Sequence, residues 1–157
     1  MAEAGENIRF HERFHIEGGN FANAGAISSR VKRILKDAGF PGKIIRRTSI
    51  AAFEAEMNVI CYANQGNLSL TIAPNFLRVV VKDEGDGIPD INLAMREGYS
   101  TANEKIRELG FGAGMGLSNI KRNTDEMILT SRLGEGTYLE FTVFLDRQEN
   151  ELPFEQV

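Results

Sequence analysis

The sequence predicts an α+β fold, a two-layer α/β sandwich in which helices cover one face of a mixed, mostly antiparallel sheet. Two observations lead to this prediction. Segments in which apolar and polar residues alternate occur as neighbouring pairs, and segments with helical spacing lie apart from those pairs. Strands that pair with their sequence neighbours, with the helices grouped separately, are typical of α+β domains.

The first strand and the first helix are expected within residues 8–38. The apolar residues that alternate along the strand are Ile8, Phe10, Phe14 and Ile16. Asn20 then suits the N-cap of a helix, and Gly39 followed by Pro41 is a common stop signal. The residues at helical spacing between these limits are Ala24, Ile27, Val31, Ile34 and Ala38.

A second helix is expected from about Ile44 to Ala63, with a break at Gln65-Gly66-Asn67. The residues that share one face of it are Ile44, Thr48, Ala51, Ala55, Val59 and Tyr62. Two strands follow at residues 68–72 and 77–81, joined by a turn at Pro74-Asn75. The second of these strands is almost continuously apolar, so we expect it to be central in the sheet.

The last part of the chain is expected to hold a helix and a closing hairpin. The residues on one face of the helix are Leu117, Ile120, Thr124 and Met127. Two strands, at residues 127–131 and 137–145, flank a glycine turn and therefore predict a hairpin.

Length, composition and charge restrict the classes to which the protein belongs. With 157 residues, 42% hydrophobic and 25% charged, it is expected to form one domain over residues 1–145, followed by a polar, acidic tail over residues 146–157. The net charge of -4 gives no attraction to nucleic acid or anionic membranes, and no apolar run approaches the ~20 residues that span a bilayer. The single cysteine, Cys61, excludes an intramolecular disulfide and suits a reducing compartment. Because residues 1–7 do not resemble a signal peptide, we expect a cytoplasmic protein.

Two candidate chemical groups lie on the second helix. Glu54 and Asn58 are four residues apart, so on a helix they share one face, one turn apart. A carboxylate can act as a general base or bind a water, and an amide oxygen is a hard ligand suited to Mg²⁺. A solvated helix face with a common residue pair is the alternative.

A short polar segment, residues 83–88, follows the apolar strand. The Asp83 carboxylate would lie at the strand end, where it could accept a hydrogen bond from an exocyclic amine such as that of adenine. Gly85 and Gly87 leave space for a flat base to approach the backbone. An ordinary Asp/Gly turn is the alternative.

A glycine-rich segment, residues 110–117, precedes the last helix. Glycines at alternate positions suit neither a strand nor a helix. The backbone N–H groups of such a segment, together with the positive end of the helix dipole, can bind phosphate. No Gly-Lys-Ser/Thr follows, so this is not a P-loop, and no strand precedes it as in the dinucleotide-binding fingerprint. A flexible linker is the alternative.

A fourth segment, Gly134-Glu135-Gly136-Thr137, enters the last strand. It is either a plain hairpin turn or a site where the hydroxyl or the backbone of Thr137 lies near phosphate. The order of the four segments resembles the N, G1, G2 and G3 boxes of the GHKL ATPases, which include gyrase, the Hsp90 chaperones, sensor histidine kinases and mismatch-repair ATPases. The resemblance covers about residues 8–145 and implies the Bergerat ATP-binding fold, with ATP and Mg²⁺ as cofactors.

The resemblance also implies a role for individual residues. Glu54 matches the general base, Asn58 the Mg²⁺ ligand and Asp83 the residue that reads adenine. The other residues matched to ATP-binding positions are Gly85, Gly87, Ile88, Gly112, Gly114, Met115, Gly116, Leu117 and Thr137. One position departs from the pattern, because anti-sigma factors carry an arginine before the G2 glycines and this chain has Gly112-Ala113 there.

Within the superfamily the chain looks like the anti-sigma-factor serine kinases, and most like the switch kinase of bacterial stressosomes. This implies an ATP–Mg²⁺-binding regulatory protein, expected to be a serine/threonine protein kinase in an anti-sigma-factor or stress-signalling switch. A non-catalytic, ATP-dependent module that binds a partner is the alternative, and a detached sensor-kinase domain is a third, less favoured one. The expected partner is a protein: an anti-sigma-antagonist-type substrate, a sigma factor or a phosphatase. Homodimerisation is left open.

Residues from about Ile91 to Phe111 are expected to form a nucleotide-sensitive lid, because they join the adenine segment to the phosphate segment. Short helical segments are expected in it around Leu93 and Ile106. Lys105 or Arg107 could supply the charge that the absent arginine would bring to the γ-phosphate.

Overall fold

A computed structural model describes residues 7–96 and 116–145 of the chain. The strands are β1 (Phe10–Glu17), β2 (Ala63–Ile72), β3 (Phe76–Gly85), β4 (Glu126–Arg132) and β5 (Gly136–Phe144). The helices are α1 (Ala26–Asp37), α2 (Gly42–Tyr62), α3 (Ile91–Ala94) and α5 (Gly116–Asn123), with a short 3-10 helix η1 (Phe21–Asn23). The strands, the three long helices and the short helix around Leu93 are therefore confirmed as elements. The predicted extent of the last helix is wrong: α5 ends at Asn123, so Thr124 lies beyond it and Met127 belongs to β4.

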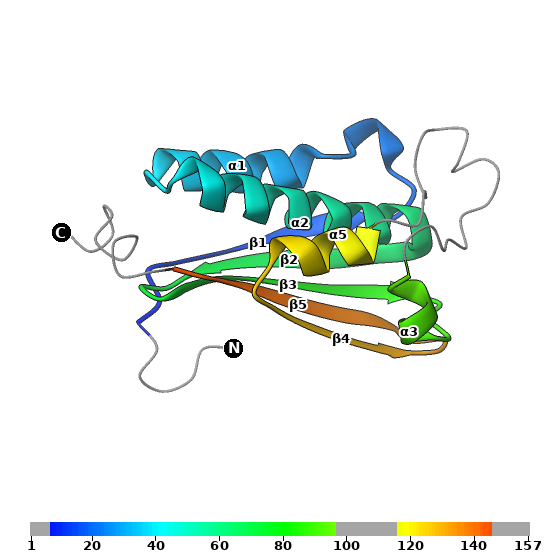
Figure 1. Ribbon diagram of the computed structural model, residues 1–157. Coiled ribbons are helices and arrows are strands. Elements are labelled where there is room, and N and C mark those ends of the chain that lie inside the picture. Colours follow the sequence, from blue (N-terminus) through cyan, green and yellow to red (C-terminus); the bar gives the residue numbers. More distant parts are fainter. Residues whose placement is uncertain (1–6, 97–115, 146–157) are drawn as a thin grey trace.

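The strands form one sheet in the order β1-β2-β3-β5-β4, with α1, α2 and α5 together on one face (Figure 1). The predicted α+β fold, with helices on one side of a sheet, is confirmed. All four strand pairs are antiparallel, so the described strands contain none of the parallel pairing that a mixed sheet would have. As predicted, β3 lies in the centre of the sheet.

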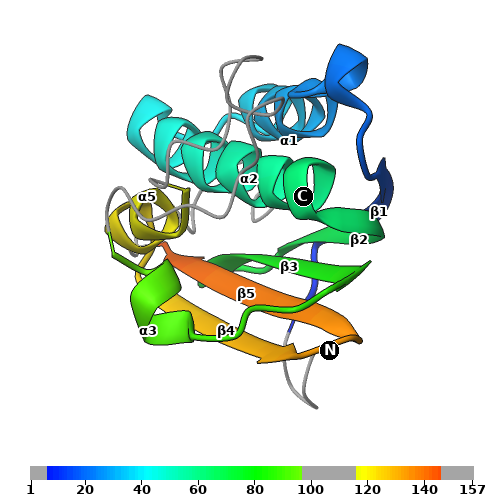
Figure 2. The same cartoon turned by 90° about the vertical axis from the view of Figure 1, so that its right-hand side faces the viewer.

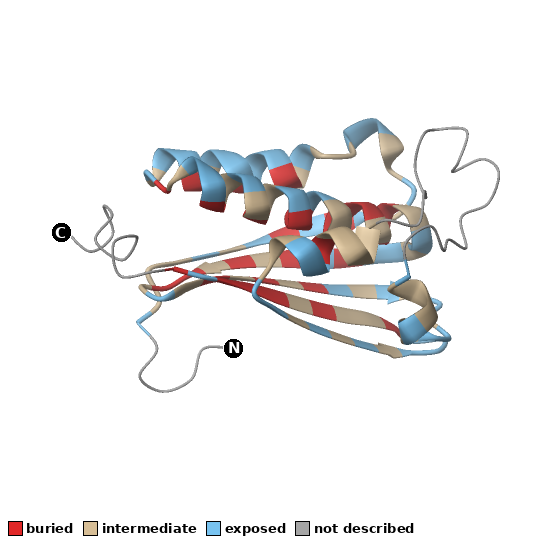
Figure 3. Cartoon of the chain, viewed as in Figure 1, coloured by how far each residue is buried: buried red, intermediate tan, exposed pale blue. Residues whose placement is uncertain are grey.

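The core lies between the sheet and the helical layer (Figure 3). Along β3 every second side chain, at Leu77, Val79 and Val81, is buried beneath the helices. Above them α2 contributes small buried residues, including Ala51 and Ala55. Small side chains let a helix approach a sheet closely, and α2 accordingly lies directly over the middle strands (Figure 2).

The start of α1 differs from the prediction. Asn20 stands at the N-cap of η1 and makes no side-chain capping bond, whereas α1 follows Gly25, whose φ is +91°. The α2 residue Glu56, only 1% exposed, caps α1 instead. Its carboxylate accepts hydrogen bonds from the backbone N–H groups of Gly25, Ile27 and Ser28, at 3.1, 3.3 and 2.9 Å.

The junction between α2 and β2 also differs. β2 begins at Ala63, so Gln65-Gly66-Asn67 lies inside a strand and does not break the chain into a loop. A Cβ on Gly66 would lie 2.7 Å from the Lys82 carbonyl oxygen of β3 and 3.1 Å from Val59 Cγ1 of α2, so this glycine lets β2 pass close to both. Tyr62, expected on the buried face, is 40% exposed at the last turn of the helix.

No helix in the described ranges is both long and apolar enough to cross a membrane.

Candidate functional site

Glu54 and Asn58 lie half-buried on the side of α2 that faces the start of α5. A Cβ on Gly116, the first residue of α5, would lie 3.4 Å from Asn58 Oδ1 and 3.9 Å from Glu54 Oε1. The next residue, Leu117, packs against the core. The structure thus brings together residues predicted from two distant segments. We call Glu54, Asn58 and Gly116 the helix-side group.

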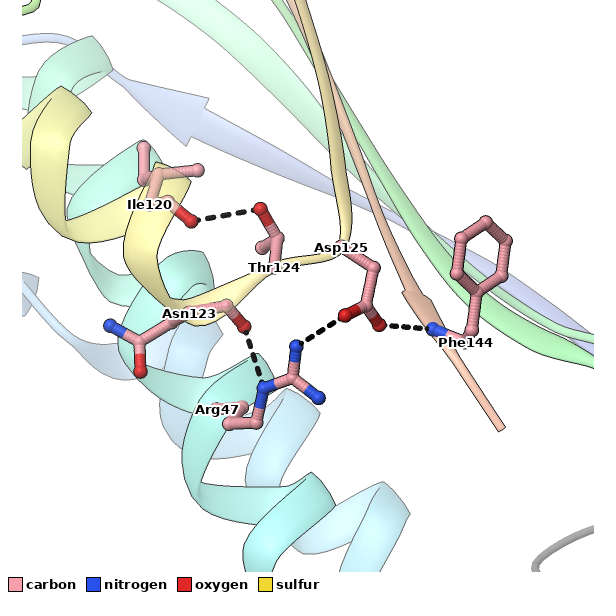
Figure 4. A network of polar contacts seen from close by, with 6 residues as sticks. All are labelled: Arg47, Ile120, Asn123, Thr124, Asp125 and Phe144. Atoms are coloured by element: carbon pink, nitrogen blue, oxygen red, sulfur yellow. Dashed lines mark hydrogen bonds and ion pairs between the residues drawn. The ribbon is translucent and has the colours of Figure 1, made fainter. Parts of the chain in front are cut away.

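Polar contacts fix the far end of α5 beside α2 (Figure 4). Arg47 of α2 donates through Nε to the Asn123 carbonyl oxygen at 3.2 Å and through Nη2 to Asp125 Oδ1 at 2.9 Å. Asp125 Oδ2 accepts in turn from the Phe144 N–H of β5 at 2.7 Å. Because the last turn of α5 is joined to both α2 and the sheet, its first turn keeps its place beside the helix-side group.

A second set of predicted residues meets where β3 ends against the β4–β5 hairpin. Lys82 pairs with Tyr138, so the next residues, Asp83 and Thr137, are cross-strand neighbours, both in phase with the buried, helix-facing side chains. The Thr137 N–H donates to Asp83 Oδ1 at 3.0 Å. A Cβ on Gly136, whose φ is +135°, would lie 2.0 Å from the Asp83 carbonyl oxygen, so only glycine lets the hairpin close here.

Ser131 of β4 joins this hairpin to the segment after β3. Its Oγ accepts from the Ile88 N–H at 2.7 Å, donates to the Gly136 carbonyl oxygen at 3.1 Å and lies 3.0 Å from Thr137 Oγ1. Gly87, with φ +81°, passes so close that a Cβ would lie 2.5 Å from a backbone oxygen of β4. We call Asp83, Ile88, Ser131 and Thr137 the strand-side group.

The Asp83 carboxylate is partly desolvated. Burial raises the pKa of Asp83, and the hydrogen bond from the Thr137 N–H opposes that rise. Oδ1 already accepts this bond, and within residues 7–96 and 116–145 no partner is found for Oδ2. Asp83 therefore presents a carboxylate oxygen that can accept from an external donor.

The last turn of α2 separates the two groups. A Cβ on Gly66 would lie 3.1 Å from Val59 Cγ1 and 3.2 Å from Asp83 Cβ. A Cβ on Gly85 would lie 3.0 Å from the Tyr62 carbonyl oxygen. Asp83 of the strand-side group therefore lies near the last turn of α2, the turn that follows Glu54 and Asn58. In the described part of the chain no hydrogen bond joins the two groups.

Several predicted residues lie outside the described residues. These are Gly112, Gly114 and Met115 of the phosphate segment, and positions 97–111 of the expected lid, with Ile106, Lys105 and Arg107. Where the structure does describe side chains, no cluster of three or more His, Cys, Asp or Glu is placed to bind a metal ion. An amide oxygen such as Asn58 Oδ1 is a hard ligand of the kind that Mg²⁺ accepts.

Sequence reasoning missed two residues of the site. Asn119 donates through Nδ2 to Glu54 Oε2 at 2.7 Å, and Ser131 joins the strand-side group. The helical spacing from Gly116 to Asn119 was the only local signal for the first. For the second, the hairpin register would have placed Ser131 opposite Thr137.

Comparison with known proteins finds a family model, curated relatives and a solved structure that are similar to this chain. Residues 45–149, which contain both groups, match the family model described as histidine kinase-, DNA gyrase B-, and HSP90-like ATPase. The serine/threonine-protein kinase RsbT of Bacillus subtilis (strain 168) is 32% identical over 113 residues, which cover 69% of this chain and 79% of that protein. An anti-sigma F factor of Caldanaerobacter subterraneus subsp. tengcongensis is 31% identical over 102 residues, covering 62% and 68%. A solved histidine kinase domain from Erythrobacter litoralis EL346 aligns with a TM-score of 0.47 at 20% identity, covering 80% of this chain and 63% of that one.

Proposed function

The chain belongs to the family of histidine kinase-, DNA gyrase B-, and HSP90-like ATPases, and from this premise we propose that it binds ATP with Mg²⁺ and phosphorylates a serine or threonine of a protein partner. One observation carries the proposal: Glu54 and Asn58 lie against the first residue of α5, with Asn58 Oδ1 3.4 Å from a Cβ position on Gly116. Similarity to a protein named as a serine/threonine kinase supports the choice of acceptor.

The strand-side group binds the base in this proposal. Asp83 Oδ2 accepts from the 6-amino group of adenine, while its Oδ1 is fixed by the Thr137 N–H. Ile88 lies beside the ring in this proposal. Cβ positions on Gly85 and Gly87 would meet backbone oxygens of Tyr62 and Arg132, so these glycines allow close packing at the edge of the base site and do not open space for the ring as the sequence suggested. The contact between Thr137 and Asp83 favours the adenine end for Thr137, in place of the position near phosphate that the sequence suggested.

The helix-side group binds the phosphates and the acceptor. Asn58 Oδ1 is a ligand for Mg²⁺, which would neutralise charge on the triphosphate. Backbone N–H groups at Gly116 and Leu117 face the phosphates at the positive end of α5. Glu54 orients the acceptor hydroxyl, and since phosphoryl transfer depends mostly on positioning and charge stabilisation, these contacts supply most of what the reaction needs.

A non-catalytic role is the second candidate. Gly112-Ala113 stands where anti-sigma factors carry an arginine that reaches the γ-phosphate, and the chain is also similar to proteins named anti-sigma F factor. In this role ATP would order a surface that binds a sigma factor or a phosphatase, and no phosphate would be transferred.

Incubation with γ-labelled ATP, Mg²⁺ and candidate partner proteins tests the proposal. We expect acid-stable label on a serine or threonine of one partner. ATP binding without label on any partner would favour the non-catalytic role, and acid-labile label on a histidine would contradict both.

A further inference from the structure

A chain of side-chain hydrogen bonds runs along α5 and ends on Glu54. Asn119 Nδ2 donates to Glu54 Oε2 at 2.7 Å, and Arg122 Nη2 donates to Asn119 Oδ1. A guanidinium group can only donate, so it fixes the amide oxygen of Asn119 toward itself. The NH₂ group must then point at the carboxylate. Two neighbours of opposite charge therefore set the orientation of this amide.

Within residues 7–96 and 116–145, only one oxygen of the Glu54 carboxylate accepts a hydrogen bond. Oε2 accepts from Asn119, whereas Oε1 lies toward Gly116. Glu54 and Asn119 are both half-buried, while Arg122 is exposed. A free glutamate side chain samples several rotamers, and a hydrogen bond to one oxygen restricts it to those in which the other faces the nucleotide.

We propose that Asn119 is a positioning residue for Glu54, and that Arg122 holds Asn119 in the donating orientation. The inference rests on the proposed function, in which Glu54 orients the acceptor hydroxyl. Asn119 touches neither Asn58 nor Asp83 among the described contacts, so its effect falls on turnover and leaves nucleotide affinity unchanged.

The substitution Asn119→Asp tests this directly, because it keeps the shape and the acceptor for Arg122 but removes the donor and places a second carboxylate against Glu54. We expect kcat for phosphotransfer to fall about 10-fold in Asn119→Ala and up to roughly 100-fold in Asn119→Asp, with KM for ATP unchanged. If Asn119 served only as a partner for Arg122, the order of the kcat losses would be reversed: Asn119→Ala would lose more, and Asn119→Asp would be close to wild type. That order would overturn the inference.

Asn123→Ala is the matched control, since Asn123 is an asparagine one turn further along α5. Among the described residues its side chain bonds only to the Asn119 carbonyl oxygen, at 2.8 Å. This variant should leave kcat within about twofold of wild type. An equal loss of kcat in Asn123→Ala and Asn119→Ala would mean that the helix, and not the amide, is responsible.

A thermal-unfolding cycle with Glu54→Gln tests the hydrogen bond without activity. Asn119→Asp should lower Tm by ~2–4 °C beside Glu54, and by less beside Gln at that position, whose NH₂ group can donate to the new carboxylate. If the Tm shifts of the two substitutions simply add, the hydrogen bond between Asn119 and Glu54 is refuted.

If wild type binds ATP but transfers no phosphate to any partner, the proposed function fails and the positioning role of Asn119 fails with it. If wild type is active and the cycle is additive, the inference alone fails.

Discussion

Asp83 carries a partly buried carboxylate that lowers the stability of the protein at neutral pH. Burial raises the pKa of Asp83 above its value of 3.8 in the unfolded chain, so the native state binds the proton more tightly. Native proteins with such a group lose stability as pH rises from the unfolded-state pKa through the folded-state pKa, and the loss remains at neutral pH. A ligand amine that donates to Oδ2 would offset part of it.

Replacing Asp83 with Asn should therefore separate stability from binding. Asn can still accept from the Thr137 N–H, so we expect the Tm of the apo variant at pH 7 to equal or exceed that of wild type. The difference should shrink as pH falls below the raised pKa of Asp83, where the wild-type carboxyl is protonated. The rise in Tm caused by ATP–Mg²⁺ should decrease, and selectivity over GTP should weaken, because the amide is no longer a double acceptor. Unchanged ATP affinity and selectivity would rule out the adenine assignment.

Glu54 and Asn58 are expected to differ in what they contribute. Glu54→Gln keeps the size of the side chain but removes its charge, so ATP should bind normally while phosphotransfer falls by the ~10²–10⁴-fold typical of the loss of a general base. Asn58→Ala should instead weaken Mg²⁺-dependent binding of ATP. Calorimetric titration with and without Mg²⁺, alongside the labelled-ATP assay, measures both effects. Equal loss of binding in the two variants would show that the assigned roles are wrong.

At the scale of elements, the position of α1 depends on a carboxylate from another helix. Glu56 of α2 accepts three backbone N–H groups at the start of α1, which has no capping side chain of its own. Glu56→Gln replaces one acceptor oxygen with a donor and should lower the free energy of unfolding by about 2 kcal/mol. Glu12→Gln is the control, because the exposed ion pair between Glu12 and Arg30 should be worth less than about 1 kcal/mol. Urea unfolding measures the free energy of unfolding of both variants. Equal losses in Glu56→Gln and Glu12→Gln would show that the cap on α1 contributes no more than an exposed ion pair.

Two glycines of the β4–β5 turn allow a second comparison. Both have positive φ, but a Cβ on Gly134 would meet nothing within 4 Å, whereas one on Gly136 would lie 2.0 Å from the Asp83 carbonyl oxygen. Gly134→Ala should cost only the backbone term, about 1 kcal/mol. Gly136→Ala should cost more and should also weaken ATP binding, since it pushes the hairpin away from Asp83. If both variants unfold at the same urea concentration, the close approach is not required.

The sequence predicted most elements because alternation and helical spacing report on burial within one segment. The alternating residues of β1 and the helical repeat of α1 are examples. The strand start at Ala63 and the cap by Glu56 were missed because each depends on a second segment: α2 passing over Gly66 in one case, and a residue 31 positions away in the other. The same reason applies to the site. Spacing identified Glu54, Asn58 and Asp83, but the bonds of Asn119 and Ser131 are set by the packing of α5 and of the hairpin.

For the whole molecule, the architecture explains why one ligand would connect distant parts of the chain. The helix-side group belongs to α2 and α5. The strand-side group belongs to β3, β4 and β5 and to the segment that follows β3, which contains Ile88. The ends of these elements lie near one another in the ribbon (Figures 1 and 2). A nucleotide bound to both groups would join the helical layer to the sheet there. It would also stabilise the native state by mass action, by about 2.7 kcal/mol at a ligand concentration of 100 Kd.

Mapping of ATP–Mg²⁺ onto the backbone amide resonances of the ¹⁵N-labelled protein tests most directly whether the two groups form one nucleotide site. The amides of Gly85, Ile88, Gly116 and Thr137 should shift together, with a single dissociation constant. Those of Ala73 and Phe76, at the opposite end of β2 and β3, should not move. Shifts confined to one group, shifts centred on the β2–β3 turn, or no shifts at saturating ATP would contradict a shared site.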